Sequence, residues 1–157
     1  MKKAINAGLG FGITSGVTTT LGMVVGLLSS GATKPAILSA IFIIAFSDAL
    51  SDAFGVHVSQ ESQEGSQKDP WKAALVTFFA KLIVALTFTI PIFLFSFSGQ
   101  IYASILWGIF LTITYSFYLG KKNKENVLAV VSEHLLVSVC VIFVSYFIGA
   151  FVYRFIN

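Results

Sequence analysis

Long apolar stretches separated by short polar segments dominate the chain. A helix needs about 20 mostly apolar residues to cross the hydrocarbon core of a bilayer, and five stretches approach or exceed that length. None of them alternates apolar and polar residues as the strand of a membrane barrel would. The pattern predicts an all-α polytopic membrane protein whose single transmembrane domain covers residues 1–157. The five expected helices cover residues 5–28, 36–58, 71–97, 101–119 and 127–155.

Prolines mark the polar segments and interrupt one apolar stretch. Pro35 and Pro70 stand where the second and third helices are expected to begin, a position that proline favours. Residues 96–100 are expected to form a short turn before the fourth helix. Pro91 lies inside the third stretch, so we expect it to kink that helix or to release a carbonyl within it.

Basic residues are divided unevenly between the two sides that five crossings define. Lysine and arginine are enriched on the cytoplasmic side of membrane proteins. The N-terminus is therefore expected in the cytoplasm and the C-terminus outside, and we expect the membrane to be a prokaryotic plasma membrane. One side holds Lys2, Lys3, Lys68, Lys72, Lys121, Lys122 and Lys124, whereas the other holds only Lys34 and Arg154.

Composition and motifs narrow the classes of function. Charged residues make up only 11% of the chain, against about 25% in soluble domains, so lipid is expected to solvate part of the exterior. The net charge is +3 without a basic patch interleaved with aromatics, which disfavours a nucleic-acid partner. Cys140 is the single cysteine and is expected to be a small buried hydrophobe. Hydrolase, nucleotide-binding and redox motifs are absent, so neither an enzyme nor a cofactor is predicted.

Ionisable side chains inside the apolar stretches are the strongest functional signal. A charge at the centre of a membrane helix costs about 2.5–3.5 kcal/mol even on the mildest scale, so such groups usually serve a function. A rise of about 1.5 Å per residue places five of them roughly 10–16 Å below the same membrane surface. We therefore expect one polar layer or cavity in that half. The five residues are Asp48, Asp52, Lys81, Glu133 and His134.

Asp48 and Asp52 are separated by one helical turn and share a face, about 6 Å apart. Two carboxylates that close repel each other unless one is protonated, a cation lies between them, or a basic group reaches in. Their oxygens suit a divalent metal ion. The alternative is an internal salt bridge that only stabilises the bundle, formed by Lys81 with Asp48 or Glu133.

His57 and Glu61 repeat the same spacing near the expected end of the second helix. They are candidates for a metal site or a proton relay at the membrane edge. The alternative is a solvated helix end.

Small and hydroxyl-bearing residues crowd the first expected helix. Gly8, Gly12 and Gly16 recur at four-residue spacing, which allows another helix to approach closely. The expected outcomes are packing within the chain, a subunit interface, or a substrate path along this helix.

The order of these features resembles the vacuolar iron transporter family over nearly the whole chain. The run SGVTTTLGMVVGL at residues 15–27 is similar to the first membrane helix of that family. The run DALSDAFGVHVS at residues 48–59, followed by Ser62-Gln63, resembles the second. The resemblance implies a homodimer that exports Fe²⁺ or Mn²⁺ from the cytoplasm in exchange for protons. It also implies a metal path near the first two helices, at the dimer interface.

The chain departs from the family at three ligand positions. Ser15 stands where the family has an aspartate, Asp52 where it has a methionine, and Val56 where it has a glutamate. The segment 59–70 is much shorter than the Glu-rich metal-binding insert that many members carry there. Transport of another cation or a small solute therefore stays open, as does a non-transporting assembly protein with structural charges. The candidate metal-site residues are Asp48, Asp52, Ser15, His57 and Glu61, with Thr19 beside the path, and the candidates for charge or proton coupling are Lys81, Glu133 and His134.

Overall fold

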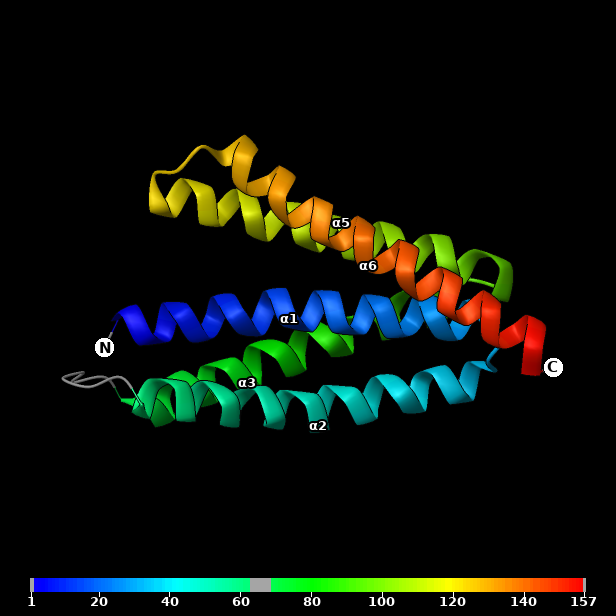
Figure 1. Cartoon of the computed structure of the whole chain (residues 1–157), viewed down its shortest axis with the longest axis horizontal. Helices are drawn as coiled ribbons and strands as arrows, with labels where there is room; N and C mark the ends of the chain where they lie inside the picture. Colours follow the sequence, from blue (N-terminus) through cyan, green and yellow to red (C-terminus); the bar gives the residue numbers. More distant parts are fainter. Residues whose placement is uncertain (1, 63–68, 157) are drawn as a thin grey trace.

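The computed structural model describes residues 2–62 and 69–156, and over these residues the chain is helical apart from short connections (Figure 1). Five spans, counting α3 with α4 as one, are long and apolar enough to cross a membrane, which confirms the predicted all-α architecture of an integral membrane protein. Gln63 and Lys68, used in the sequence arguments, lie outside the described residues. The helices are α1 (Lys2–Ser29), α2 (Lys34–Glu61), α3 (Pro70–Thr87), α4 (Thr89–Leu94), α5 (Phe97–Asn123) and α6 (Val127–Ile156).

The third span breaks where proline predicted a kink. Pro91 has no N–H to bond the carbonyl of Thr87 four residues earlier, and α3 ends at that residue. The backbone N–H of Phe88 instead donates to the carbonyl of Ala85 at 3.1 Å, which tightens the last turn. The hydroxyl of Thr87 accepts a 3.0 Å hydrogen bond from the indole N–H of Trp107 on α5.

The turn predicted over residues 96–100 is wrong in its extent. Phe95 and Ser96 adopt extended conformations, and α5 begins at the next residue. The N–H of Gln100 donates to the carbonyl of Ser96 at 3.0 Å, so this stretch is already helical. The buried amide of Gln100 also donates to the carbonyl of Ile92 at 3.0 Å and thereby links α5 to α4.

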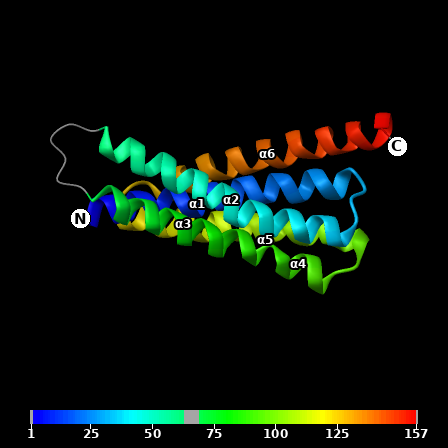
Figure 2. The ribbon, with the colours of Figure 1, turned by 90° about the horizontal axis from the view of Figure 1, so that it is seen from below.

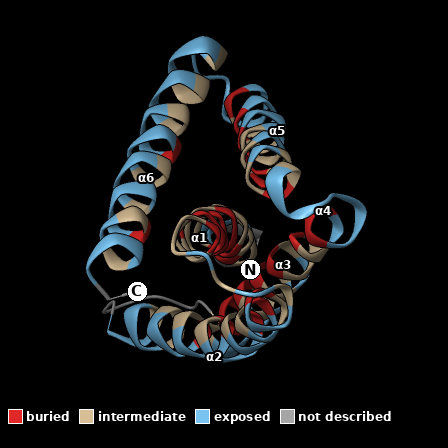
Figure 3. Ribbon diagram, turned by 90° about the vertical axis from the view of Figure 1, so that its right-hand side faces the viewer, coloured by how far each residue is buried: buried red, intermediate tan, exposed pale blue. Residues whose placement is uncertain are grey.

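Helix α1 lies at the centre of the bundle. It contacts α2, α3, α5 and α6, and the view along the bundle shows these helices around it (Figure 3). The chain termini lie at opposite ends (Figures 1 and 2), and we name the two ends of the bundle after them. The α5–α6 connection lies at the N-terminal end, and the α1–α2 connection lies at the C-terminal end.

The buried residues recur every fourth position, which is the spacing of close helix packing in membranes. On α1 a Cβ added at Gly12 would lie 2.7 Å from the carbonyl oxygen of Thr77 on α3, so glycine is required for this approach. The glycine stripe thus packs within the chain, one of the outcomes expected from sequence. The apolar core fills the C-terminal half of the bundle and comprises Val17, Leu21, Val24, Val25, Leu28, Ile37, Ile41, Phe88 and Ile92.

Cys140 is exposed on α6, contrary to the expectation of a buried residue. Only a narrow stripe of α6 packs against the bundle. In the apolar window of the candidate span on α6, 11% of the residues are buried. The remaining surface of α6 is apolar and suits contact with lipid.

Asp69 caps the N-terminus of α3 at the edge of the membrane span. Its side chain accepts a hydrogen bond from the N–H of Lys72 at 3.2 Å, and the Lys72 ammonium lies 2.7 Å away. These bonds hold the pKa of the Asp69 carboxyl below its ordinary value of 3.8. The stabilisation is therefore complete above that ordinary value and is lost as the pH falls through the lower pKa of the folded state.

We expect Asp69→Ala to lower the midpoint of thermal unfolding modestly at pH 7, because the first turn of α3 loses its cap. The difference from wild type should shrink under strongly acid conditions, where the wild-type carboxyl is protonated. Circular dichroism melts of both proteins in detergent micelles at the two pH values test this. A difference that stays constant with pH would contradict it.

Candidate functional site

Four polar side chains from three helices meet near the middle of the bundle. Lys81 of α3 is buried, with 1% of its side chain exposed, and its Nζ lies 2.6 Å from Oδ2 of Asp48 on α2. The same ammonium contacts Oδ2 of Asp52 on α2 and donates to Oγ of Ser15 on α1 at 2.9 Å. Ser15 in turn donates to Asp52 at 2.6 Å. We call these four residues the acid–lysine cluster.

Small residues bring the three helices close enough to form this cluster. A Cβ added at Gly16 would lie 3.3 Å from the backbone and side chain of Lys81, so α1 covers the aliphatic stem of the lysine directly. On α2 the buried positions Ala45, Ala49 and Ala53 present only methyl groups. Because the helices approach so closely, the ammonium can reach both carboxylates while its stem stays out of water.

The cluster holds two carboxylates and one ammonium, and therefore one surplus negative charge when all three groups are ionised. Asp52 accepts hydrogen bonds from both Ser15 and Lys81. Asp48 forms an ion pair with Lys81, but the angles of this contact are not those of a hydrogen bond. The carboxylates are not sealed in, since 29% of the Asp48 side chain and 20% of the Asp52 side chain are exposed. An unpaired charge in such a site is costly, so the surplus charge favours binding of a cation or a proton.

The salt bridge offered as an alternative from sequence, Lys81 with Asp48 or Glu133, is present with Asp48. Lys81 pairs with Asp48, as that alternative predicted, and also with Asp52. It does not pair with Glu133, which is exposed on α6. The five ionisable groups therefore do not meet in one cavity, since Glu133 is exposed and His134 bonds to Ser116. Depth along a helix can be read from sequence, but the direction in which the side chain points depends on packing.

His57 and Glu61 lie apart from the cluster, at the N-terminal end. The ring Nε2 of His57 is 3.7 Å from a carboxylate oxygen of Glu61, and the imidazole packs against Trp71 of α3 in a tilted arrangement, with ring centroids 4.3 Å apart. The side chain of Glu61 is 70% exposed. Thr19, expected beside the path, uses its hydroxyl to bond the carbonyl of Ser15 at 2.8 Å. The candidate metal-site residues thus form two separate groups.

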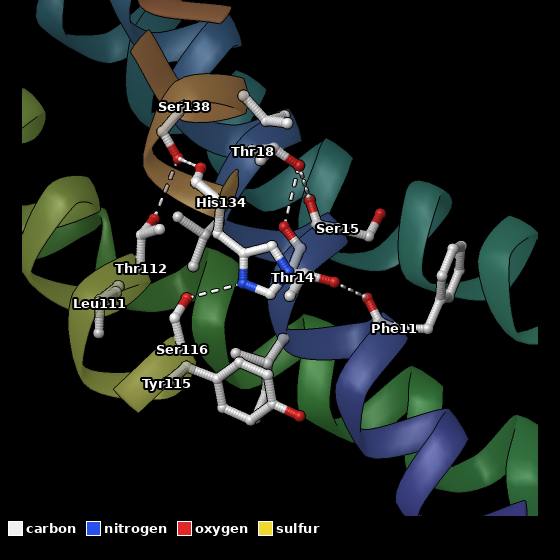
Figure 4. Close-up of a pocket in the computed structure, with 13 residues that line it drawn as sticks. Phe11, Thr14, Ser15, Thr18, Leu111, Thr112, Tyr115, Ser116, His134 and Ser138 are labelled. Carbon is white, nitrogen blue, oxygen red and sulfur yellow. Dashed lines mark hydrogen bonds between the residues drawn. The ribbon is translucent and has the colours of Figure 1, made fainter. Parts of the chain in front are cut away.

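His134 faces a cavity of about 360 Å³ between α1, α5 and α6. Its Nδ1 is 2.7 Å from the hydroxyl of Ser116 on α5, and in Figure 4 the second ring nitrogen is directed toward Thr14 of α1. Ser15 also lines this cavity. We call it the histidine chamber. The chamber is lined by Phe11, Ile13, Thr14, Ser15, Val17, Thr18, Leu111, Thr112, Tyr115, Ser116, His134, Val137 and Ser138.

The α5 side of the chamber was not found by sequence analysis. The sequence did contain a pattern that indicates this face, because small or polar residues recur at every fourth position along the buried side of α5. Such a stripe marks the interior face of a membrane helix. The stripe consists of Gln100, Ser104, Gly108, Thr112, Ser116 and Gly120.

Among the described residues, no three histidine, cysteine, aspartate or glutamate side chains are grouped closely enough to hold a metal ion. The oxygen atoms of the cluster that could bind a metal ion belong to Asp48, Asp52 and Ser15, and the ammonium of Lys81 contacts all three residues. No protein-family model, curated protein or solved structure matches the chain. The fold and the cluster define the chain as a polytopic α-helical membrane protein with a buried polar site.

Proposed function

We propose that the protein is a transporter of divalent cations of the Fe²⁺ or Mn²⁺ type, with Asp48 and Asp52 as the carboxylates that bind the cation. The observation that carries the proposal is the surplus carboxylate of the acid–lysine cluster, at a site where both acids are still partly exposed. Carboxylate and hydroxyl oxygens are suitable ligands for such ions. Ser15 supplies the hydroxyl.

The ammonium of Lys81 and a bound cation would compete for the same two carboxylates. At an effective dielectric constant of 20, two unit charges 4 Å apart repel by about 4 kcal/mol, and a divalent ion doubles this. A divalent cation and the ammonium of Lys81 therefore do not share the carboxylates. Entry of the cation requires that the ammonium withdraw or release its proton. Where the ammonium releases its proton, binding of the cation and loss of a proton are linked, which supports exchange of the cation for protons.

The distribution of apolar residues supports access from one end. The apolar core fills the C-terminal half of the bundle, beyond the cluster. The positive-inside rule places the N-terminal end in the cytoplasm. On that basis the proposed cation enters from the cytoplasm and is exported. The proposal also includes the homodimer that the family resemblance implies, and the mass of the protein in lipid nanodiscs tests that part.

Metal uptake into proteoliposomes tests the proposed function. We expect the double variant Asp48→Asn with Asp52→Asn to transport Mn²⁺ or Fe²⁺ at least about tenfold more slowly than wild type, because loss of groups around a metal site costs about 10–100-fold. Asp69→Asn, at an exposed carboxylate outside the cluster, is the matched control. Wild-type rates in the double variant would contradict the proposal. A competition screen across other cations and small solutes separates the proposed ions from other substrates.

A second candidate function is supported by the burial of Lys81. An ammonium with 1% of its side chain exposed, in contact with three partners, fits a structural salt bridge in a membrane assembly protein. That protein would show no ion flux in any proteoliposome assay, whereas its stability would still depend on Lys81.

A further inference from the structure

The histidine chamber is closed toward the C-terminal end and narrowed toward the N-terminal end. On the C-terminal side, Leu21 of α1 packs directly on Gly108 of α5, where an added Cβ would lie 2.8 Å from the leucine. On the N-terminal side, the hydroxyl of Tyr115 reaches across to α1 and lies 3.2 Å from the position of a Cβ at Gly10. The α5–α6 hairpin leans away from α1 toward the N-terminal end (Figure 1).

The lining of the chamber combines a largely apolar surface with hydroxyls and one imidazole. Eight of its thirteen residues carry a hydroxyl or an imidazole, and they come from all three helices (Figure 4). A volume of about 360 Å³ corresponds to about a dozen water molecules at the density of the liquid. Several hydroxyls donate to carbonyls of their own helix, as Thr14 does to Gly10 at 2.9 Å, which leaves their lone pairs available to accept from water.

Ser15 belongs to both the chamber and the acid–lysine cluster. It lines the chamber while its hydroxyl donates to Asp52 at 2.6 Å and accepts from Lys81 at 2.9 Å. Both of these bonds are made within the cluster, so Ser15 is the point at which the chamber meets the carboxylate of Asp52. We propose that the histidine chamber is a hydrated access path that brings protons from the N-terminal end, past His134 and Ser15, to Asp52.

His134 is the imidazole of the chamber lining, and its ring nitrogens can bond to hydroxyls or to water. From α5 it faces Ser116 and the phenol of Tyr115, the other titratable group of the lining, and from α1 it faces hydroxyls. On α6 itself the neighbouring Glu133 is exposed. Hydration of the chamber stands by itself, whereas delivery of protons to Asp52 rests on the proposed transport function.

Cysteine labelling tests hydration without any assay of transport. In a Cys140→Ala background, Val137→Cys places a thiol in the lining of the chamber, and Leu136→Cys places one at the adjacent residue; both residues are exposed, but only Val137 lines the chamber. Only the thiolate reacts, and thiolates form in water and not in lipid. We expect a charged methanethiosulfonate reagent to label Val137→Cys about tenfold faster than Leu136→Cys in liposomes. Equal, slow labelling would overturn the proposal, since an acyl chain or a dry gap would then fill the chamber.

The pH profile of transport tests the proton path. His134→Gln keeps a hydrogen-bonding side chain but cannot bind and release a proton, so we expect Mn²⁺ uptake by this variant to lose most of the pH dependence that the wild-type protein shows. An unchanged pH profile would overturn the role of His134. Absence of uptake by the wild-type protein would contradict the transport function, and rapid labelling of Val137→Cys would still support a hydrated chamber.

Discussion

Replacement of Lys81 with methionine is expected to lower the free energy of unfolding by about 3–5 kcal/mol, the usual cost of removing one partner from a buried ion pair. Methionine fills much of the same volume, so the loss comes mainly from charge. Asp48 and Asp52 would each lose the ammonium that they contact, and both would have to be protonated or remain unpaired. Denaturant or thermal unfolding in lipid bicelles measures the change.

Two controls separate the charge effect from general damage. Lys72→Met removes an exposed ion pair on the same helix, with 53% of the lysine side chain exposed, and should change stability by about 0–1 kcal/mol. The triple variant Lys81→Met, Asp48→Asn and Asp52→Asn removes the orphan charges and should recover part of the loss. Equal effects of Lys81→Met and Lys72→Met would contradict the buried cluster.

Gly12→Ala is expected to lower the free energy of unfolding by about 1–3 kcal/mol, the usual cost of overpacking a close contact. The added Cβ would lie 2.7 Å from the carbonyl oxygen of Thr77 and 2.9 Å from the Cβ of Ala80. Backbone and short side chains cannot move aside as a flexible side chain would, so α1 and α3 must separate. That movement would also draw Ser15 away from Lys81. Unfolding in bicelles gives the stability.

Gly55→Ala is the matched control for this substitution. Gly55 also lies within a long helix, but a Cβ there meets nothing within 4 Å. Alanine favours a helix over glycine by about 1 kcal/mol, so this variant should be neutral or more stable. A destabilisation as large as that of Gly12→Ala would show that close packing is not the cause.

The apolar stretches alone determined the five spans and the position of most connections, because helix length in a membrane is set by the thickness of the hydrocarbon core. Pro91 correctly predicted the break between α3 and α4, since a missing N–H acts locally. The start of α5 was placed too late, because Phe95 and Ser96 complete the turn and Gln100 bonds to α4 through its buried amide. That bond depends on tertiary contacts.

For the site, the sequence by itself determined which ionisable groups lie within the membrane and that Asp48 and Asp52 share a face, since both follow from helical spacing. Only the tertiary structure decided which groups meet. It joined Lys81 to both aspartates, turned Glu133 to the surface and placed His134 in a separate chamber. The physical reason is that spacing fixes the depth and relative angle of a residue on its helix, whereas the rotation of each helix in the bundle is set by small residues such as Gly12 and Gly16 packing against α3.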